Sequence, residues 1–318
     1  MEQNSYNNLG FRIKTISQAT REAITYIKER REHSIESLKT RWPKFNKFCM
    51  GGIEPNTVYT IAGMSGSGKS AMANLIETDL FDQNPGKDII VLSFTLEMSS
   101  SRQIGRKFSN KLKKTTSELY SANEDLDDDS FNRILGISKS LSKYNIYYVD
   151  DPGTPEEVSR FIFNFYNEYV KDKHQYFVII YDHALLTGKS GTTLDTISDL
   201  QKEFIKVKKL PLTTVIELSQ LNRNIEASER INNPQNQFPI RSDLSSSDAI
   251  YQSCDYVLVV HRPELLGLTT YGPNRWPVSN KIYVHIIKNR DGKPVILDFD
   301  NELRYNNMKE SVTESTNN

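Results

Sequence analysis

The stretch from Thr57 to Ser70 constrains this 318-residue chain more than any other. It reads TVYTIAGMSGSGKS, so an apolar run of β-forming residues leads into a glycine-rich turn that opens a helix. This is the phosphate-loop pattern G-x-x-x-x-G-K-[ST] in its required context, with a strand before the turn and a helix after it. The glycines let successive backbone N–H groups point inward, where they and the positive end of the helix dipole bind phosphate oxygens. An ordinary strand-to-helix turn has no need of a Lys–Ser pair directly after its last glycine.

The pattern therefore predicts a nucleoside triphosphate site, with ATP and Mg²⁺ as cofactors. Lys69 would reach the β- and γ-phosphates, and the Ser70 hydroxyl would ligate Mg²⁺. The residues expected to hold the nucleotide are Gly63, Met64, Ser65, Gly66, Ser67, Gly68, Lys69 and Ser70.

Composition and charge exclude several other classes of protein. Lys+Arg and Asp+Glu are 40 each, so the net charge is zero and any basic footprint for nucleic acid must be local. Cys49 and Cys254 lie far apart and form no disulfide or zinc pattern, which favours buried free thiols in a reducing compartment. The first residues show no signal-peptide pattern, and the apolar runs are too short to span a membrane. We therefore expect a cytoplasmic protein with no membrane partner.

Strands and helices alternate after the phosphate loop. Continuous apolar strands between helices favour an α/β fold with a mainly parallel central sheet. Asn289-Arg-Asp-Gly292 signals an antiparallel hairpin near the end of the chain. Strands are expected at 88–94, 145–149, 177–181, 213–219, 255–261, 281–288 and 294–299. Helices are expected at 99–113, 125–143, 155–169 and 194–209.

Two further segments affect the domain division. Residues 19–38 have the pattern of an amphipathic helix with an apolar stripe, which would pack either on its own domain or on a neighbouring subunit. Residues 222–247 lack periodicity and are rich in Asn, Ser, Arg and Gln, so we expect a long functional loop. The expected division is an N-terminal arm with a linker helix at 1–40, an ATPase domain at 41–305 and a disordered tail at 306–318.

Three strand ends carry side chains suited to nucleotide hydrolysis. Asp182 follows a buried strand, where its carboxylate would hold Mg²⁺ unless it merely caps a turn. Glu97 follows the strand at 88–94, which lies beside the phosphate-loop strand in RecA-like cores. Its carboxylate would then act as the general base, unless it is simply exposed or caps a helix. Gln220 ends another strand, where an amide can sense the γ-phosphate.

Taken together, these motifs resemble the ATPase domain of DnaB-type replicative helicases, the hexameric RecA-like helicases of bacteria and their phages. The resemblance extends over residues 35–305. Residues 95–98, TLEM, are similar to that family's S-L-E-M, and residues 218–223 match its L-S-Q-L-N-R. Residues 242–244 resemble its S-D-L, and residues 288–292 its K-x-R-x-G.

The resemblance implies roles for residues that the pattern alone leaves open. Glu97 would polarise the attacking water, and Gln220 would be the phosphate sensor. Lys288 and Arg290 would reach into a neighbouring subunit's site, where an arginine can be worth about 10³–10⁵-fold in rate; two solvated charges at a hairpin are the alternative. In this family the loop after the sensor Gln lines a pore for single-stranded DNA. The expected DNA contacts are then Arg223, Arg230, Arg241 and, on another loop, Lys189.

Three departures from the family pattern stand out. The family's S-D-L-R-E-S-G becomes SDLSSSD at 242–248, which loses the Arg and the Glu. Its D-Y-L-Q becomes Asp182-His-Ala-Leu185, which changes the surroundings of the metal carboxylate. Residues 1–40 can supply only a linker-type helix and not the family's N-terminal domain, so a helicase loader or primase is left as an open partner.

We therefore expect the motor of an ATP-dependent replicative DNA helicase of phage or plasmid type. The resemblance implies that it would form a homo-oligomeric ring of six subunits, move along single-stranded DNA and unwind duplex. Two alternatives stay open. One is a RecA- or RadA-like DNA-stimulated ATPase, and the other is an ATP-gated accessory or loading factor without processive unwinding.

Overall fold

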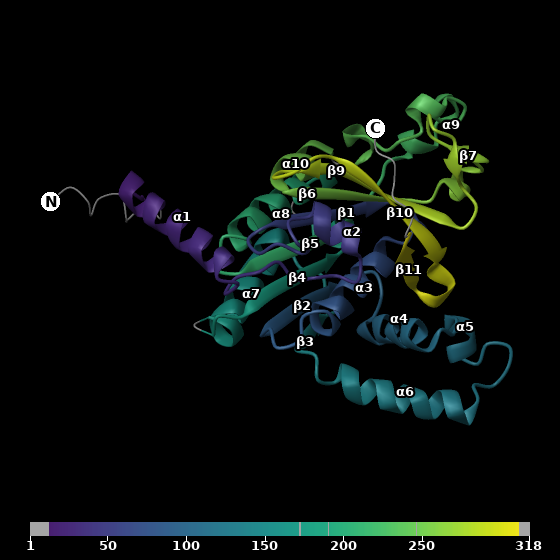
Figure 1. The fold of residues 1–318 in the computed structure, drawn as a ribbon, viewed down its shortest axis with the longest axis horizontal. Helices are drawn as coiled ribbons and strands as arrows, with labels where there is room; N and C mark the ends of the chain where they lie inside the picture. Colours follow the sequence, from purple (N-terminus) through teal and green to yellow (C-terminus); the bar gives the residue numbers. More distant parts are fainter. Residues whose placement is uncertain (1–12, 172, 190, 246, 312–318) are drawn as a thin grey trace. The chain divides into compact units, whose positions relative to one another are not determined.

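The structure, a computed structural model, describes residues 13–171, 173–189, 191–245 and 247–311 (Figure 1). The chain divides into two compact units, Met1–Ser37 and Leu38–Asn318. In the first unit α1 covers Ile16–Arg31, and none of its residues is buried. Thr15 and Gln18 form a capping box at its start. The helix ends earlier than expected because His33 adopts a left-handed φ of 59°.

The second unit is built on a nine-stranded sheet of order β11-β10-β9-β6-β1-β5-β4-β2-β3. The six strands from β6 to β3 are parallel, and β9, β10 and β11 extend the sheet in antiparallel fashion. The strands are β1 (Val58–Gly63), β2 (Ile89–Thr95), β3 (Ile146–Val149), β4 (Tyr176–Asp182), β5 (Thr213–Gln220), β6 (Tyr256–His261), β9 (Lys281–Asn289), β10 (Val295–Glu302) and β11 (Asn307–Glu310). A separate ribbon consists of β7 (Thr270–Tyr271) and β8 (Trp276–Pro277). The expected α/β fold with a mainly parallel sheet and a C-terminal hairpin is confirmed.

Helices cover both faces of this sheet, which explains why the strands β1, β2, β4 and β6 are buried along their whole length. Side chains alternate across β1, so Tyr59 and Ile61 join one buried cluster while Val58 and Ala62 join the other. The first cluster includes α2 (Pro43–Phe48) and α3 (Lys69–Asp82). The second includes α7 (Pro155–Phe165), α8 (Thr193–Val207) and α10 (Ser247–Ser253). The remaining α-helices are α4 (Ser100–Leu112), α5 (Thr116–Leu119), α6 (Asp128–Leu141) and α9 (Ser228–Ile231).

The C-terminal boundary expected at residue 305 is wrong. Residues 307–310 form β11, which pairs with β10, while residues 312–318 of the expected tail lie outside the described residues. A residue distant in the sequence stabilises β11, because the Trp42 indole N–H donates to the Met308 carbonyl oxygen at 3.0 Å. A short polar strand at the sheet edge has little apolar pattern of its own, so the sequence did not indicate it.

The segment at 222–247 is a long connection, as expected, but it is locally ordered by short helical turns. Besides α9 it holds 3-10 turns at Arg223–Glu226, Pro234–Asn236 and Arg241–Asp243. Asparagines cap two of these turns: the Asn222 side chain accepts from Asn224 N–H, and the Asn233 side chain accepts from Gln235 N–H. Among the helices of the described stretches, none combines the length and apolar content needed to cross a membrane.

Candidate nucleotide-binding site

The phosphate loop joins the end of β1 to the start of α3. Gly66 and Gly68 adopt positive φ angles of 75° and 107°, which glycine tolerates because it lacks a Cβ. A Cβ on Gly63 would lie 2.6 Å from the Val260 carbonyl oxygen, so this strand end admits no larger residue. The Ser67 hydroxyl oxygen is buried and has no hydrogen-bond partner among the described residues. The loop thus keeps its backbone open to an anion and leaves a buried hydroxyl available to it.

Lys69 begins α3, and its ammonium group lies inside the loop. The residue is 8% exposed, and Nζ donates to the Met64 carbonyl oxygen at 3.1 Å. Burial lowers the pKa of Lys69, while the carboxylates of Glu97 and Asp182 raise it. The site therefore holds a buried cation beside two carboxylates, a charge arrangement that suits a polyphosphate bound together with a divalent metal.

Asp182 ends β4 on the other side of this cation. It is 6% exposed, and burial together with the charge of Glu97 raises its pKa to about 6. Lys69, Arg106 and a hydrogen bond from Ser70 act in the opposite direction. Asp182 Oδ1 is buried without a hydrogen-bond partner in the part of the chain that the structure describes. Mg²⁺ takes oxygen ligands, so the Ser70 hydroxyl and the Asp182 carboxylate fit this ion, which when bound would neutralise phosphate charge.

Glu97 and Gln220 meet at a third residue, His183. His183 Nε2 lies 3.8 Å from Glu97 Oε2 and 3.3 Å from Gln220 Nε2. The Glu97 side chain is 53% exposed, whereas His183 is buried. The Leu96 N–H donates to the Asp182 carbonyl oxygen at 2.9 Å, which ties the end of β2 to the end of β4. The expectation that the Glu97 strand lies beside the phosphate-loop strand is wrong, because β5 and β4 stand between β1 and β2. The strand ends still converge because the carboxyl ends of parallel strands share one edge of the sheet.

Lys69, Glu97 and Gln220 line one cavity of about 280 Å³. Its lining consists of Met64, Ser65, Gly66, Gly68, Lys69, Ser70, Ala71, Glu97, Arg106, Gln220, Leu303 and Asn306. Asp182 lines a second, smaller cavity of about 20 Å³, and Ser70 borders both. Arg106, on α4, was not singled out from the sequence. Burial lowers its pKa while Asp182 and Glu97 raise it, and no hydrogen bond or ion pair within the described residues engages its guanidinium. Only the packing of α4 turns Arg106 into the cavity, since no local motif marks it.

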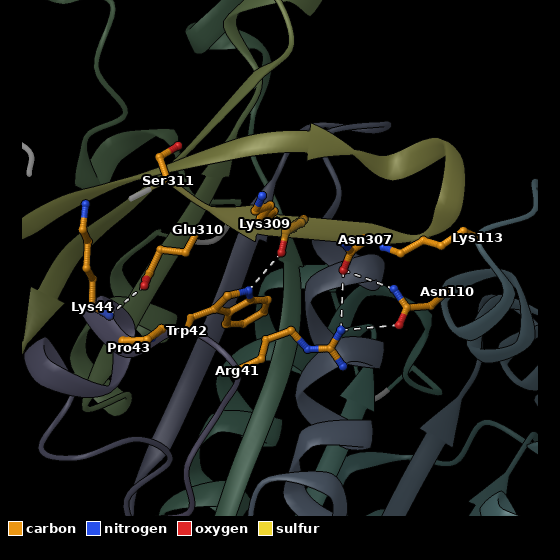
Figure 2. A pocket seen from close by; sticks show the side chains of 11 residues that line it. Arg41, Trp42, Pro43, Lys44, Asn110, Lys113, Asn307, Lys309, Glu310 and Ser311 are labelled. Carbon is orange, nitrogen blue, oxygen red and sulfur yellow. Dashed lines mark hydrogen bonds between the residues drawn. The ribbon is translucent and has the colours of Figure 1, made fainter. Parts of the chain in front are cut away.

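A larger cavity, of about 580 Å³, lies between the segment at 41–44 and β11 (Figure 2). Its polar groups bond to one another. Arg41 Nη1 donates to Asn110 Oδ1 at 3.4 Å, and Glu310 accepts from the Lys44 backbone N–H at 2.7 Å. It shares no lining residue with the phosphate-loop cavity. We place the functional site in the phosphate-loop cavity, because buried groups with shifted pKa values converge there.

Comparison with known proteins identifies the family. The model of the DnaB-like helicase C-terminal domain matches residues 13–309. The chain belongs to this family. The replicative DNA helicase DnaB of Buchnera aphidicola subsp. Baizongia pistaciae is 30% identical over 220 residues, which are 67% of this chain and 44% of that protein. The replicative DNA helicase DnaC of Bacillus subtilis is 24% identical over 266 residues, 82% of this chain and 54% of that protein. The chain thus spans about half the length of the curated relatives it matches.

Solved structures support the fold of this DnaB-like domain. One is a DnaB-like replicative helicase studied with its interactions with primase, and it superposes with a TM-score of 0.74 at 19% identity. The match covers 94% of this chain and 67% of the helicase chain. Another is a solved ATPase domain, with a TM-score of 0.75 at 19% identity. That match covers 92% of this chain and 98% of the solved domain. The resemblance to the DnaB-type family is therefore confirmed, and so is the RecA-like fold that it implied.

The two basic residues of the DnaB-like K-x-R pattern lie outside the phosphate-loop cavity of their own chain. The Lys288 ammonium donates to the Tyr251 carbonyl oxygen and lies 4.9 Å from the centre of the Tyr251 ring. Arg290 Nη1 lies 3.2 Å from Asp255 Oδ1, and its side chain is half exposed. Neither residue lines the cavity.

The arginines of the long loop differ in their surroundings. Arg230 is engaged inside the loop: Nη1 pairs with Asp243, Nε donates to the Asn236 carbonyl oxygen and Nη2 to that of Phe238. Arg241 pairs with Asp248 at the surface. The other two residues expected to contact DNA, Arg223 and Lys189, are exposed. The loop thus uses one arginine to hold its own shape and leaves the other cations at the surface.

Proposed function

We propose that this chain is the ATP-hydrolysing motor of a replicative DNA helicase that moves along single-stranded DNA and unwinds duplex. The observation that carries the proposal is one cavity in which the phosphate loop, the Glu97 carboxylate and the Gln220 amide converge in a member of the DnaB-like family. The Asp182 carboxylate interacts with Lys69 and Ser70 of the same loop. The domain at 41–305, extended by β11, would form this motor, and residues 1–40 its linker arm. It would act in the cytoplasm of a bacterial host.

Each group at the site has a role in this proposal. The phosphates of ATP would bind to the loop at Gly63–Ser70, and above all to Lys69. Mg²⁺ would be held by Ser70 and Asp182. Glu97 would take a proton from the attacking water, because its carboxylate is half exposed beside the buried ammonium of Lys69. Arg106 would stabilise phosphate charge from within the same chain, since its guanidinium faces the cavity.

Assembly of several copies would complete the site. Arg290 and Lys288 would act on a neighbour's nucleotide, because they lie away from their own cavity. The apolar side chains of Ile24 and Ile27 on α1 are exposed and would dock on an adjacent copy. The family pattern favours a hexameric ring around single-stranded DNA. Arg223, Arg241 and Lys189 would contact the DNA backbone, whereas Arg230 would hold the loop. A loader or primase partner would be engaged through surfaces other than the phosphate-loop cavity.

The test is ATP-dependent displacement of a labelled strand from a forked duplex, with wild type beside Lys69→Ala. Displacement by the wild type and none by the variant is the expected result. DNA-stimulated ATP hydrolysis without displacement would refute unwinding and favour a DNA-stimulated ATPase or an accessory factor. Mixing Arg290→Ala subunits with Lys69→Ala subunits tests assembly, because some interfaces then pair an intact Arg290 with an intact Lys69. No recovery of activity at any ratio would exclude the action of Arg290 on a neighbour.

A further inference from the structure

His183 is the residue through which the two catalytic strand ends meet, and the family pattern has a tyrosine at this position. Its Nε2 lies 3.3 Å from the Gln220 amide and 3.8 Å from the Glu97 carboxylate. Its ring is buried, so the surrounding protein holds it in this position. None of the roles described so far uses this imidazole.

The other ring nitrogen determines which atom carries the proton. The Leu185 backbone N–H donates to His183 Nδ1 at 3.2 Å. A nitrogen that accepts a hydrogen bond carries no proton, so the neutral ring carries its proton on Nε2. A half turn of the Gln220 amide presents its oxygen to this N–H, whereas 3.8 Å to Glu97 is too long for a hydrogen bond.

Both segments proposed to contact DNA begin beside this imidazole. Gln220 ends β5, and its carbonyl oxygen accepts from the Ser245 N–H at 3.0 Å, so it is tied to both ends of the long loop. His183 opens the connection that runs through a 3-10 turn at Ala184–Leu186 to Lys189. A displacement of either segment would therefore change the distance from Nε2 to Gln220.

We propose that His183 is a positioning residue whose single Nε2–H is shared between Gln220 and Glu97. In the state described by the structure, the N–H is nearer to Gln220. When Gln220 turns toward the nucleotide, the N–H is released to Glu97 and holds the carboxylate in one orientation. A hydrogen bond to a carboxylate is the stronger of the two, which favours this second arrangement once Gln220 has moved. The role rests on the proposed function, since it assumes ATP hydrolysis at this cavity.

Two substitutions separate this role from a structural one. His183→Asn keeps a side-chain acceptor for the Leu185 N–H, as Asn222 and Asn233 do for residues two positions further on, but it cannot reach Gln220 or Glu97. His183→Gln carries an amide N–H at about the reach of Nε2. We expect kcat for ATP in His183→Asn to fall about a hundredfold, with KM and the affinity for a fluorescent non-hydrolysable ATP analogue unchanged. We expect His183→Gln to recover part of the lost rate and of the stimulation by single-stranded DNA.

Nitrogen NMR of histidine-labelled protein gives a readout that does not depend on activity. The signal that His183→Asn removes should belong to a ring protonated at Nε2. A signal from the Nδ1-protonated form would overturn the proposal, and so would a wild-type kcat in His183→Asn. Loss of analogue binding in both variants would assign His183 to the folding of the site and also overturn it. A wild-type protein that hydrolyses no ATP would refute the proposed function, while the NMR signal would still decide which nitrogen is the donor.

Discussion

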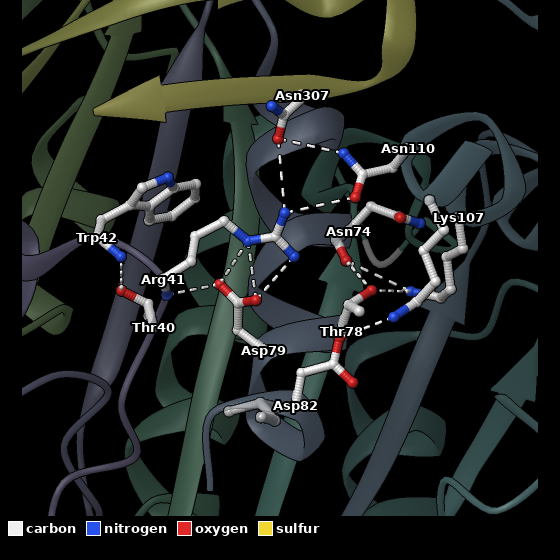
Figure 3. Close-up of polar contacts among 12 residues, drawn as sticks. Thr40, Arg41, Trp42, Asn74, Thr78, Asp79, Asp82, Lys107, Asn110 and Asn307 are labelled. Carbon is white, nitrogen blue, oxygen red and sulfur yellow. Dashed lines mark hydrogen bonds and ion pairs between the residues drawn. The ribbon is translucent and has the colours of Figure 1, made fainter. Parts of the chain in front are cut away.

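The buried ion pair between Arg41 and Asp79 tests how the segment before β1 stabilises the nucleotide site (Figure 3). Asp79 lies on α3, the helix that Lys69 begins, and is 0% exposed. Its carboxylate accepts from the Arg41 backbone N–H at 2.8 Å and from Nε at 2.8 Å, and Nη2 lies 2.8 Å away. The Arg41 side chain is 24% exposed. Loss of Arg41 would therefore leave a buried carboxylate, whereas loss of the Asp79 charge would leave a guanidinium that is partly exposed to water.

Arg41→Met removes the guanidinium, keeps an apolar stem and leaves the Asp79 carboxylate buried. Removal of one partner of a buried pair costs about 3–5 kcal/mol, and we expect about 3 because the backbone N–H still bonds to Asp79. Asp79→Asn leaves a guanidinium that can reach water, so it should cost only about 1–2 kcal/mol. The double variant should recover part of the loss, since no buried charge is then left unpaired.

The loss in Arg41→Met should depend on pH. Burial raises the pKa of Asp79, and Arg41 holds the pKa down, so in the variant it rises further. A carboxyl whose pKa is higher in the folded state loses stability as pH rises, so the cost should be larger at about pH 8 than at about pH 5. Urea unfolding at both pH values measures it. Lys202→Met is the matched control, because its pair with Asp199 is exposed to solvent and should contribute little to stability. A loss below about 1 kcal/mol, or an equal loss at both pH values, would refute the reasoning.

Three further predictions concern single residues. Glu97→Gln should bind a non-hydrolysable ATP analogue as wild type does but nearly abolish turnover; unchanged turnover would exclude Glu97 as the base. Glu217 is fully buried, and burial raises its pKa to about 7, so the protein should lose stability as pH rises from about 4.5 toward 7. Glu217→Gln should make Tm depend less on pH over this range, and Tm curves that run parallel for the two proteins would contradict the prediction. Gly63→Ala should lose about 1–3 kcal/mol of unfolding free energy and its ATP-analogue binding, because its Cβ would lie 2.6 Å from the Val260 carbonyl oxygen. Gly136→Ala is the control for it, since its Cβ would meet no atom within 4 Å and its φ, like that of Gly63, is not positive.

The strands and the phosphate loop could be predicted because their signals are local. A parallel strand buried on both faces needs an unbroken apolar run, and β4 and β6 show one. Motif positions such as Glu97 and Gln220 stand at the ends of β2 and β5, and β4, which pairs with both strands, brings them to the same edge of the sheet. The helix expected at 19–38 is α1, Ile16–Arg31, and both of its ends differ from the prediction. Its start depends on the cap at Thr15, and its end depends on the left-handed conformation of His33. Neither of these features shows in an apolar stripe.

The remaining features depend on residues that are distant in the sequence. β11 forms because its backbone pairs with β10 and accepts a hydrogen bond from the Trp42 indole. Residues 307–310 have no apolar periodicity that would predict a strand. Arg230 looks like a DNA contact in the sequence, yet Asp243 and two carbonyl oxygens engage its guanidinium in the fold. Arg106 is one basic residue among several on α4 until that helix packs against α3.

The sequence by itself determined that this chain has a phosphate loop, because the conformation it needs is set by consecutive residues: glycines that adopt positive φ, and a lysine and a serine directly after them. The tertiary structure alone decided how the loop's partners are charged and oriented. The raised pKa of Asp182 comes from burial and from Glu97, and the meeting of His183 with Gln220 comes from the alignment of β4 beside β5. Burial and electrostatic interaction depend on distances in space, and those distances exist only after the sheet has formed.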